Sequence, residues 1–173
     1  MKKITIAILF VGIAIAAAAL FLPSDQTASL SDALVLGDDF QKYVNEKYGF
    51  SLEYPKAYTI EIFPEKDSAE TIVFQGAEQQ GFQIFITPFE EAQLTKERIL
   101  RDIPGAILEG AQEAFIGTAA GQNIKALLFW SEDPLIGRTR EAWFVHIGYL
   151  YEITAYESMD ELLAGIMSTW HML

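Results

Sequence analysis

The chain opens with a long apolar run and then changes to alternating apolar and polar positions. Residues Ile4 to Leu22 contain one polar side chain, Thr5, and no charge. This run of 19 residues is close to the ~20 residues that a helix needs to cross the hydrocarbon core of a bilayer. We therefore predict a transmembrane helix within residues 1–23, a polar, flexible spacer over 24–39 and an α+β domain over 40–173.

Two interpretations of the apolar run remain open. A cleaved signal peptide would use the small residues Ala17 to Ala19 as its exit, whereas a signal anchor would keep the whole run. The bulky residues Leu20 to Leu22 favour the anchor. Lys2 and Lys3 precede the run, and no basic residue follows it until Lys42. The positive-inside rule then places the N-terminus in the cytoplasm and the domain outside it, with secretion after cleavage as the alternative.

The body of the chain has the period of two that is typical of strands with one buried face. The first such segments are Phe50 to Tyr54, Tyr58 to Ile62 and Phe82 to Ile86, and a proline comes within two residues of the end of each. Short polar or glycine-bounded connections between them indicate hairpins. Further strands are expected at Glu113 to Thr118, Asn123 to Ser131, Arg138 to Val145 and Tyr149 to Tyr156, with a turn at Ile147 and Gly148.

Two later strands are apolar without alternation, at residues 126–130 and 142–145. Such runs are expected where a strand is covered on both faces. One covering helix is predicted to begin at Thr95, whose hydroxyl can cap it, and to end at Pro104 and Gly105. The other is predicted from Met159 to about Trp170, with Ser158 and Glu161 as a capping box. These patterns predict a central antiparallel sheet with helices on both faces.

Charge and cysteine content narrow the possible partners. Without Lys2 and Lys3 the chain has 10 basic and 24 acidic residues, a formal charge of −14. Such a surface repels nucleic acid, although it could attract cations or a basic protein. The chain has no cysteine, so it can form neither a disulfide nor the lipid attachment of a lipoprotein. Bacterial export is the simplest setting for such a domain.

The sequence contains no recognisable catalytic or metal-binding motif. Its two histidines are His146, expected at a hairpin end, and His171, expected in the final helical turn. Adjacent acids that could bind calcium are Asp38 with Asp39, Glu90 with Glu91, and Glu132 with Asp133, but solvated loops explain them more simply. Glu53 and Glu61 are expected to face water. The aromatic residues that could line a groove are better explained by core packing: Trp130, Trp143, Tyr149, Tyr151 and Tyr156. We therefore predict no catalytic, cofactor-binding or metal-binding residue, and no cofactor.

The segment Tyr48 to Pro55 (YGFSLEYP), the segment Tyr151 to Ala155 (YEITA) and the order of the predicted elements resemble the PsbP and Mog1-like superfamily. This resemblance covers about residues 40–173. It implies a central antiparallel sheet between helices and an accessory or binding role. One branch acts in photosystem assembly and stabilisation, and another binds a small GTPase. No functional motif of either branch can be matched to residues of this chain.

The leading hypothesis is a non-catalytic, membrane-tethered extracytoplasmic module that binds or assists a protein partner. The alternatives are an enzyme with a dispersed carboxylate site and a structural subunit of an envelope assembly.

Overall fold

The computed structural model describes residues 38–77, 80–121 and 123–173. The predicted transmembrane helix and most of the predicted spacer lie outside these ranges, so their structure stays a prediction. Within the described part of the chain, no helix is both long and apolar enough to span a membrane.

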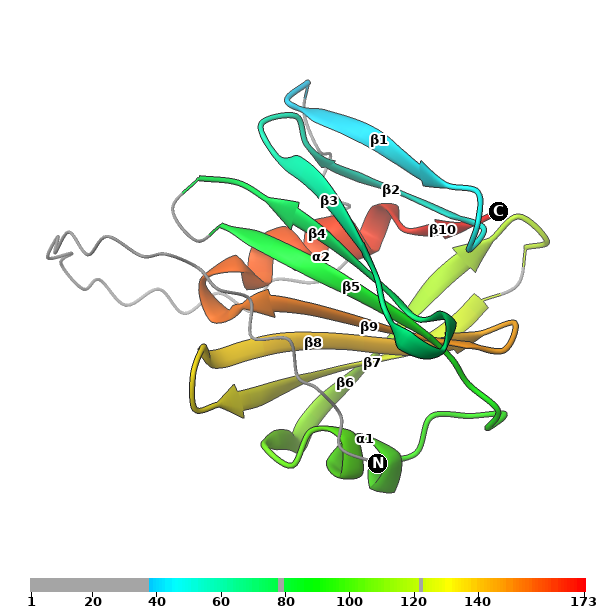
Figure 1. Ribbon diagram of the computed structural model, residues 1–173, viewed down its shortest axis with the longest axis vertical. Helices are drawn as coiled ribbons and strands as arrows, with labels where there is room; N and C mark the ends of the chain where they lie inside the picture. Colours follow the sequence, from blue (N-terminus) through cyan, green and yellow to red (C-terminus); the bar gives the residue numbers. More distant parts are fainter. Residues whose placement is uncertain (1–37, 78–79, 122) are drawn as a thin grey trace, which may run out of the picture.

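Ten strands form one large curled sheet in the order β1-β2-β10-β6-β7-β8-β9-β5-β4-β3 (Figure 1). Every pair of neighbours is antiparallel except β10 and β6, which are parallel, so the predicted antiparallel sheet is in fact mixed. The strands are β1 (Phe40–Asn45), β2 (Phe50–Pro55), β3 (Thr59–Pro64), β4 (Glu70–Gln75), β5 (Gly81–Pro88), β6 (Ala106–Thr118), β7 (Asn123–Asp133), β8 (Gly137–His146), β9 (Tyr149–Tyr156) and β10 (His171–Met172). The domain is therefore mostly β.

Two short α-helices pack against the sheet, α1 (Lys96–Asp102) and α2 (Asp160–Thr169). The two helices contribute to different apolar clusters, and the residues of β8 alternate between these two clusters. Phe144 belongs to the cluster that contains α2, whereas Trp143 belongs to the one that contains Ile99 of α1. We call these the α2 face and the α1 face of the sheet. Both side chains are fully buried, which confirms that this apolar run is covered on both faces.

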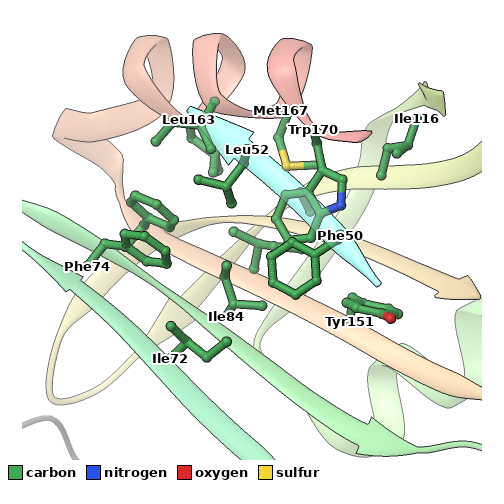
Figure 2. Close-up of a cluster of buried hydrophobic side chains, with 14 of the residues drawn as sticks. Phe50, Leu52, Ile72, Phe74, Ile84, Ile116, Tyr151, Leu163, Met167 and Trp170 are labelled. Atoms are coloured by element: carbon green, nitrogen blue, oxygen red, sulfur yellow. The ribbon is translucent and has the colours of Figure 1, made fainter. Parts of the chain in front are cut away.

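Aromatic rings fill the core on the α2 face (Figure 2). Trp170 stacks on Phe50 of β2 with centroids 4.6 Å apart. Tyr151 of β9 stacks on Phe144 at the same distance. Leu163 and Met167 point from α2 toward β2 and complete this layer. Their burial contributes to the hydrophobic effect, which is the dominant favourable term in folding.

The ends of α2 differ from the sequence prediction. The helix stops at Thr169, because Trp170 adopts an extended backbone, with φ −65° and ψ 129°, and turns into the core. His171 therefore begins β10 instead of completing the helix. A 3-10 turn, Glu157–Met159, precedes α2, so Ser158 is not at a cap position and the predicted capping box is wrong. At α1 the prediction is confirmed, since the Thr95 hydroxyl accepts a hydrogen bond from the backbone N–H of Arg98.

The edges of the sheet also differ from the prediction. Of the alternating residues predicted to face the core here, Tyr58 and Ile60 do pack against it, whereas Ile62 is 50% exposed because β3 is an edge strand. The opposite edge is β1, which the sequence pattern did not reveal. Three of its six residues are exposed, and its apolar residues Phe40, Tyr43 and Val44 do not alternate with polar ones, so the segment lacks the period of a half-buried strand.

Candidate functional site

The most unusual polar residue of the described chain is Glu141, an acid in the middle of β8. Its neighbours along the strand, Arg140 and Ala142, face α2, so alternation places Glu141 on the α1 face with Thr139 and Trp143. Glu141 is 1% exposed. A carboxyl group at this depth requires hydrogen-bond partners, because burial without them is costly.

Four neutral groups surround the carboxyl group. The hydroxyl oxygen of Thr139 lies 2.6 Å from Oε1, and that of Ser131 lies 3.0 Å from the same atom. At Oε2, the Thr154 hydroxyl donates a hydrogen bond of 2.8 Å and the Trp143 indole N–H donates one of 3.3 Å. The sheet register brings these groups together, since Ser131 pairs with Thr139 across β7 and β8, and Glu141 pairs with Thr154 across β8 and β9. We call these five residues the Glu141 cluster.

Burial raises the pKa of Glu141 above its ordinary value, and the hydrogen bonds from its four neighbours lower the pKa in part. A raised pKa is common at catalytic sites, where an acid exchanges a proton with a substrate. Such exchange requires contact between the acid and the substrate. Because Glu141 is 1% exposed, a substrate cannot contact it in this arrangement.

A second polar group lies on the α2 face around Trp130. Arg140 pairs with Trp130 across β7 and β8, and its guanidinium lies 4.8 Å from the centre of the indole ring. That of Arg138 lies 4.5 Å from the same ring. Arg140 Nε is 3.0 Å from Asp160 Oδ1, which begins α2. The ion pair with Asp160 holds the start of α2 against the sheet. Arg138 also has an acidic partner, Glu157.

The adjacent acids that the sequence suggested for calcium make local contacts instead. Glu91 pairs with Arg98 and Arg101 near the start of α1. Asp133 accepts hydrogen bonds from two backbone N–H groups of its own turn. The pair Asp38 and Asp39 lies in the turn before β1, where their carbonyl oxygens accept hydrogen bonds from Lys56. Within the ranges that the structure describes, no three acids or histidines gather where they could hold a metal ion.

The two histidines lie on different strands. His146 ends β8, and burial lowers its pKa. His171 is exposed in β10, between β2 and β6. Of the outward-facing acids, Glu61 is exposed on the edge strand β3, as predicted, and Glu53 is half-buried on β2.

The aromatic residues that could line a groove or pack in the core differ in how deeply they are buried. Trp143 and Tyr151 are fully enclosed in the two clusters, as core packing predicts. Trp130, Tyr149 and Tyr156 are half-buried. Tyr149 packs edge-on against Tyr48, with centroids 5.3 Å apart.

We did not predict Glu141 as a site residue, although the residues that follow it indicate its burial. It precedes the apolar run 142–145, and alternation puts it on the same face as Trp143. An acid on a face that a neighbouring tryptophan marks as buried indicates a buried carboxyl group. Its partners Ser131 and Thr154 lie on other strands, and only the register of the sheet brings them to Glu141.

Comparison with solved structures identifies the fold. The solution structure of cyanobacterial PsbP (CyanoP) from Synechocystis sp. PCC 6803 matches with a TM-score of 0.51 and 14% sequence identity, over 83% of this chain and 99% of that chain. The fold is PsbP-like. No protein-family model matches the chain, and no curated protein is similar to it in sequence. The PsbP-like architecture agrees with the resemblance drawn from the sequence, and at this level of identity it establishes the fold alone.

Proposed function

We propose that this protein is a non-catalytic, membrane-tethered module that binds or assists a protein partner outside the cytoplasm. The observation that carries this proposal is the use of the large aromatic and buried polar side chains to build the PsbP-like fold. Phe50, Tyr151 and Trp170 contact one another inside the domain. They are therefore not available to a ligand, and binding would use residues of the surface. Residues 1–23 would supply the tether, 24–39 the spacer and 40–173 the binding domain.

The charge of the chain supports a protein partner more than an anionic one. Without Lys2 and Lys3 the chain has a formal charge of −14. This charge disfavours nucleic acid and anionic headgroups and favours a partner with a basic surface. Several exposed apolar side chains offer points of contact, among them Phe63 on β3, Phe115 on β6 and Leu135 in the turn between β7 and β8.

An enzyme with a dispersed carboxylate site receives less support. The acid with the clearest shift in pKa is Glu141, which no substrate can contact without displacing the chain around it. The adjacent acid pairs lie in three separate places, before β1, between β5 and α1 and at the end of β7, and the contacts that they make are with nearby residues.

Site-specific photo-cross-linking in native membranes tests the proposal. A cross-linkable amino acid is placed in the full-length chain at position 63, 115 or 135, one position at a time. These side chains are 44%, 65% and 80% exposed, so the replacements are compatible with folding. Residue 97, an exposed polar position on α1, provides the matched control, because a replacement there is also compatible with folding.

The proposal predicts that one protein cross-links in a one-to-one product from one or two of positions 63, 115 and 135 and not from position 97. Because the surface is acidic, the yield should fall at high salt. Equal labelling of many proteins from all three positions, or none from any, would contradict a specific binding role.

A further inference from the structure

The three oxygen atoms at one end of the Glu141 cluster form a closed triangle. Ser131 Oγ lies 2.6 Å from Thr139 Oγ1, Thr139 Oγ1 lies 2.6 Å from Glu141 Oε1, and Ser131 Oγ lies 3.0 Å from Glu141 Oε1. All three residues are buried. At 2.6 Å the two short sides each require a hydrogen between their oxygens, because two lone pairs would otherwise face each other, and the third side, at 3.0 Å, is also within hydrogen-bond distance.

The number of available hydrogens decides the protonation state. The two hydroxyl groups supply one hydrogen each, which satisfies two sides of the triangle. If Glu141 were ionised, the third side would have no hydrogen. A hydrogen on Oε1 supplies the missing one and lets the three groups donate around the ring. Thr154 and Trp143 can still donate to Oε2, which remains a carbonyl acceptor.

The charges around the cluster do not favour an ionised carboxylate. Arg140 is adjacent in sequence, but its side chain lies on the α2 face with Asp160. On α1, Arg98 is paired with Asp102 at 2.6 Å and with Glu91. The titratable groups that face the cluster from the adjoining strands are all acidic: Asp133 of β7, and Glu152 and Tyr156 of β9. The nearest residues of β6 and β5 are uncharged, namely Ala106, Leu108, Gln83 and Phe85.

We infer that Glu141 is held in the folded domain as the neutral acid, with its hydrogen closing a ring of three hydrogen bonds. The stability of the domain thereby responds to pH, and Glu141 stabilises the domain most in acidic surroundings. The ring joins β7 to β8, and Oε2 joins β8 to β9, so ionisation would weaken the contacts among three central strands. The device is independent of any partner and goes beyond the proposed binding role.

The sign of the pH effect follows from the direction of the shift. Burial raises the folded-state pKa of Glu141 above the ordinary 4.5 that it regains on unfolding. Between those two values, unfolding releases one proton, so the unfolding equilibrium constant contributed by this residue rises tenfold for each pH unit. The contribution is fully present below pH 4.5 and is lost as the pH rises toward the folded-state pKa.

Denaturant unfolding of the full-length chain across this pH range tests the inference. Glu141→Gln keeps the shape of the neutral acid and cannot ionise, so it should lack the tenfold rise per pH unit that the wild-type chain has. It should also be the more stable of the two at alkaline pH. Glu109→Gln is the matched control, because Glu109 is exposed on β6, and its profile should run parallel to that of the wild type. Identical profiles for Glu141→Gln and the wild type would overturn the inference.

Infrared spectroscopy of the wild-type chain gives a second test that needs no variant to fold. A protonated carboxyl group has a carbonyl band that is absent from a carboxylate. The inference predicts such a band at neutral pH, with a shift in heavy water, that disappears as the pH rises. Absence of the band at neutral pH would show that Glu141 is ionised and would contradict the inference directly.

Discussion

Lys47 Nζ lies 2.6 Å from Glu70 Oε2, and this ion pair joins the two ends of the curled sheet. Lys47 lies in the turn between β1 and β2, whereas Glu70 begins β4, next to the opposite edge strand β3. The rings of Tyr43 on β1 and Phe74 on β4 meet edge-on, with centroids 5.3 Å apart. The sheet is therefore curled enough for strands from its two ends to share one core.

Lys47→Met is expected to lower the free energy of unfolding by about 1 kcal/mol, because the Glu70 side chain is 11% exposed and would lose a charged partner. Lys125→Met provides the matched control. Lys125 pairs with Glu113 across the adjacent strands β6 and β7, and both side chains are more than half exposed, at 59% and 53%. Its loss should therefore cost about 0.5 kcal/mol or less. Urea unfolding measures both, and equal losses would contradict a special role for the pair that joins the sheet ends.

The end of α2 is expected to be essential to the fold. Ile166→Ala should cost about 2 to 5 kcal/mol and Trp170→Ala about 3 to 5 kcal/mol, since both residues are buried and Trp170 stacks on Phe50. The adjacent His171 is exposed, and His146 is half-buried at a strand end, so changing either to Ala should cost about 1 kcal/mol or less. Thermal unfolding of the four variants checks these expectations. A silent Trp170→Ala would mean that the ring is not part of the core.

The elements of the inner core could be predicted from the sequence because their signal is local. Alternation at Phe50, Leu52 and Tyr54 predicted β2, and all three side chains are buried. Trp170 was placed in the helix because its spacing from Ile166 fits a helical period. The prediction that Trp170 is a core residue is confirmed, but the predicted helical backbone at this residue is wrong.

Features that depend on distant strands could not be predicted in the same way. Strand β10 has two residues and no periodicity, and it exists because β2 and β6 lie on either side of it. The Glu141 cluster draws residues from three strands whose relative register is set by the whole sheet. The exposure of Ile62 likewise follows from the place of β3 at the edge, which its own sequence does not determine.

The turn between β8 and β9 contains a strained residue whose replacement should stabilise the protein. Ile147 has a φ of +43° and is 81% exposed, although β-branched residues strongly disfavour positive φ. Ile147→Asn should raise the free energy of unfolding by about 1 kcal/mol, because asparagine tolerates this conformation. Leu135→Asn is the control, since Leu135 is 80% exposed and does not have a positive φ. A loss of stability in Ile147→Asn would show that the exposed isoleucine makes a stabilising contact.

The proposed role at the membrane depends on retention of residues 1–23, and intact-mass spectrometry tests it most directly. The protein is recovered from native membranes after an alkaline wash that removes peripheral proteins, and its mass is compared with that expected from the sequence. The predicted result is a chain that retains the apolar run Ile4 to Leu22 and stays in the washed membranes. A mature chain that starts between Leu20 and Ser24 and appears in the soluble fraction would contradict a membrane-tethered module.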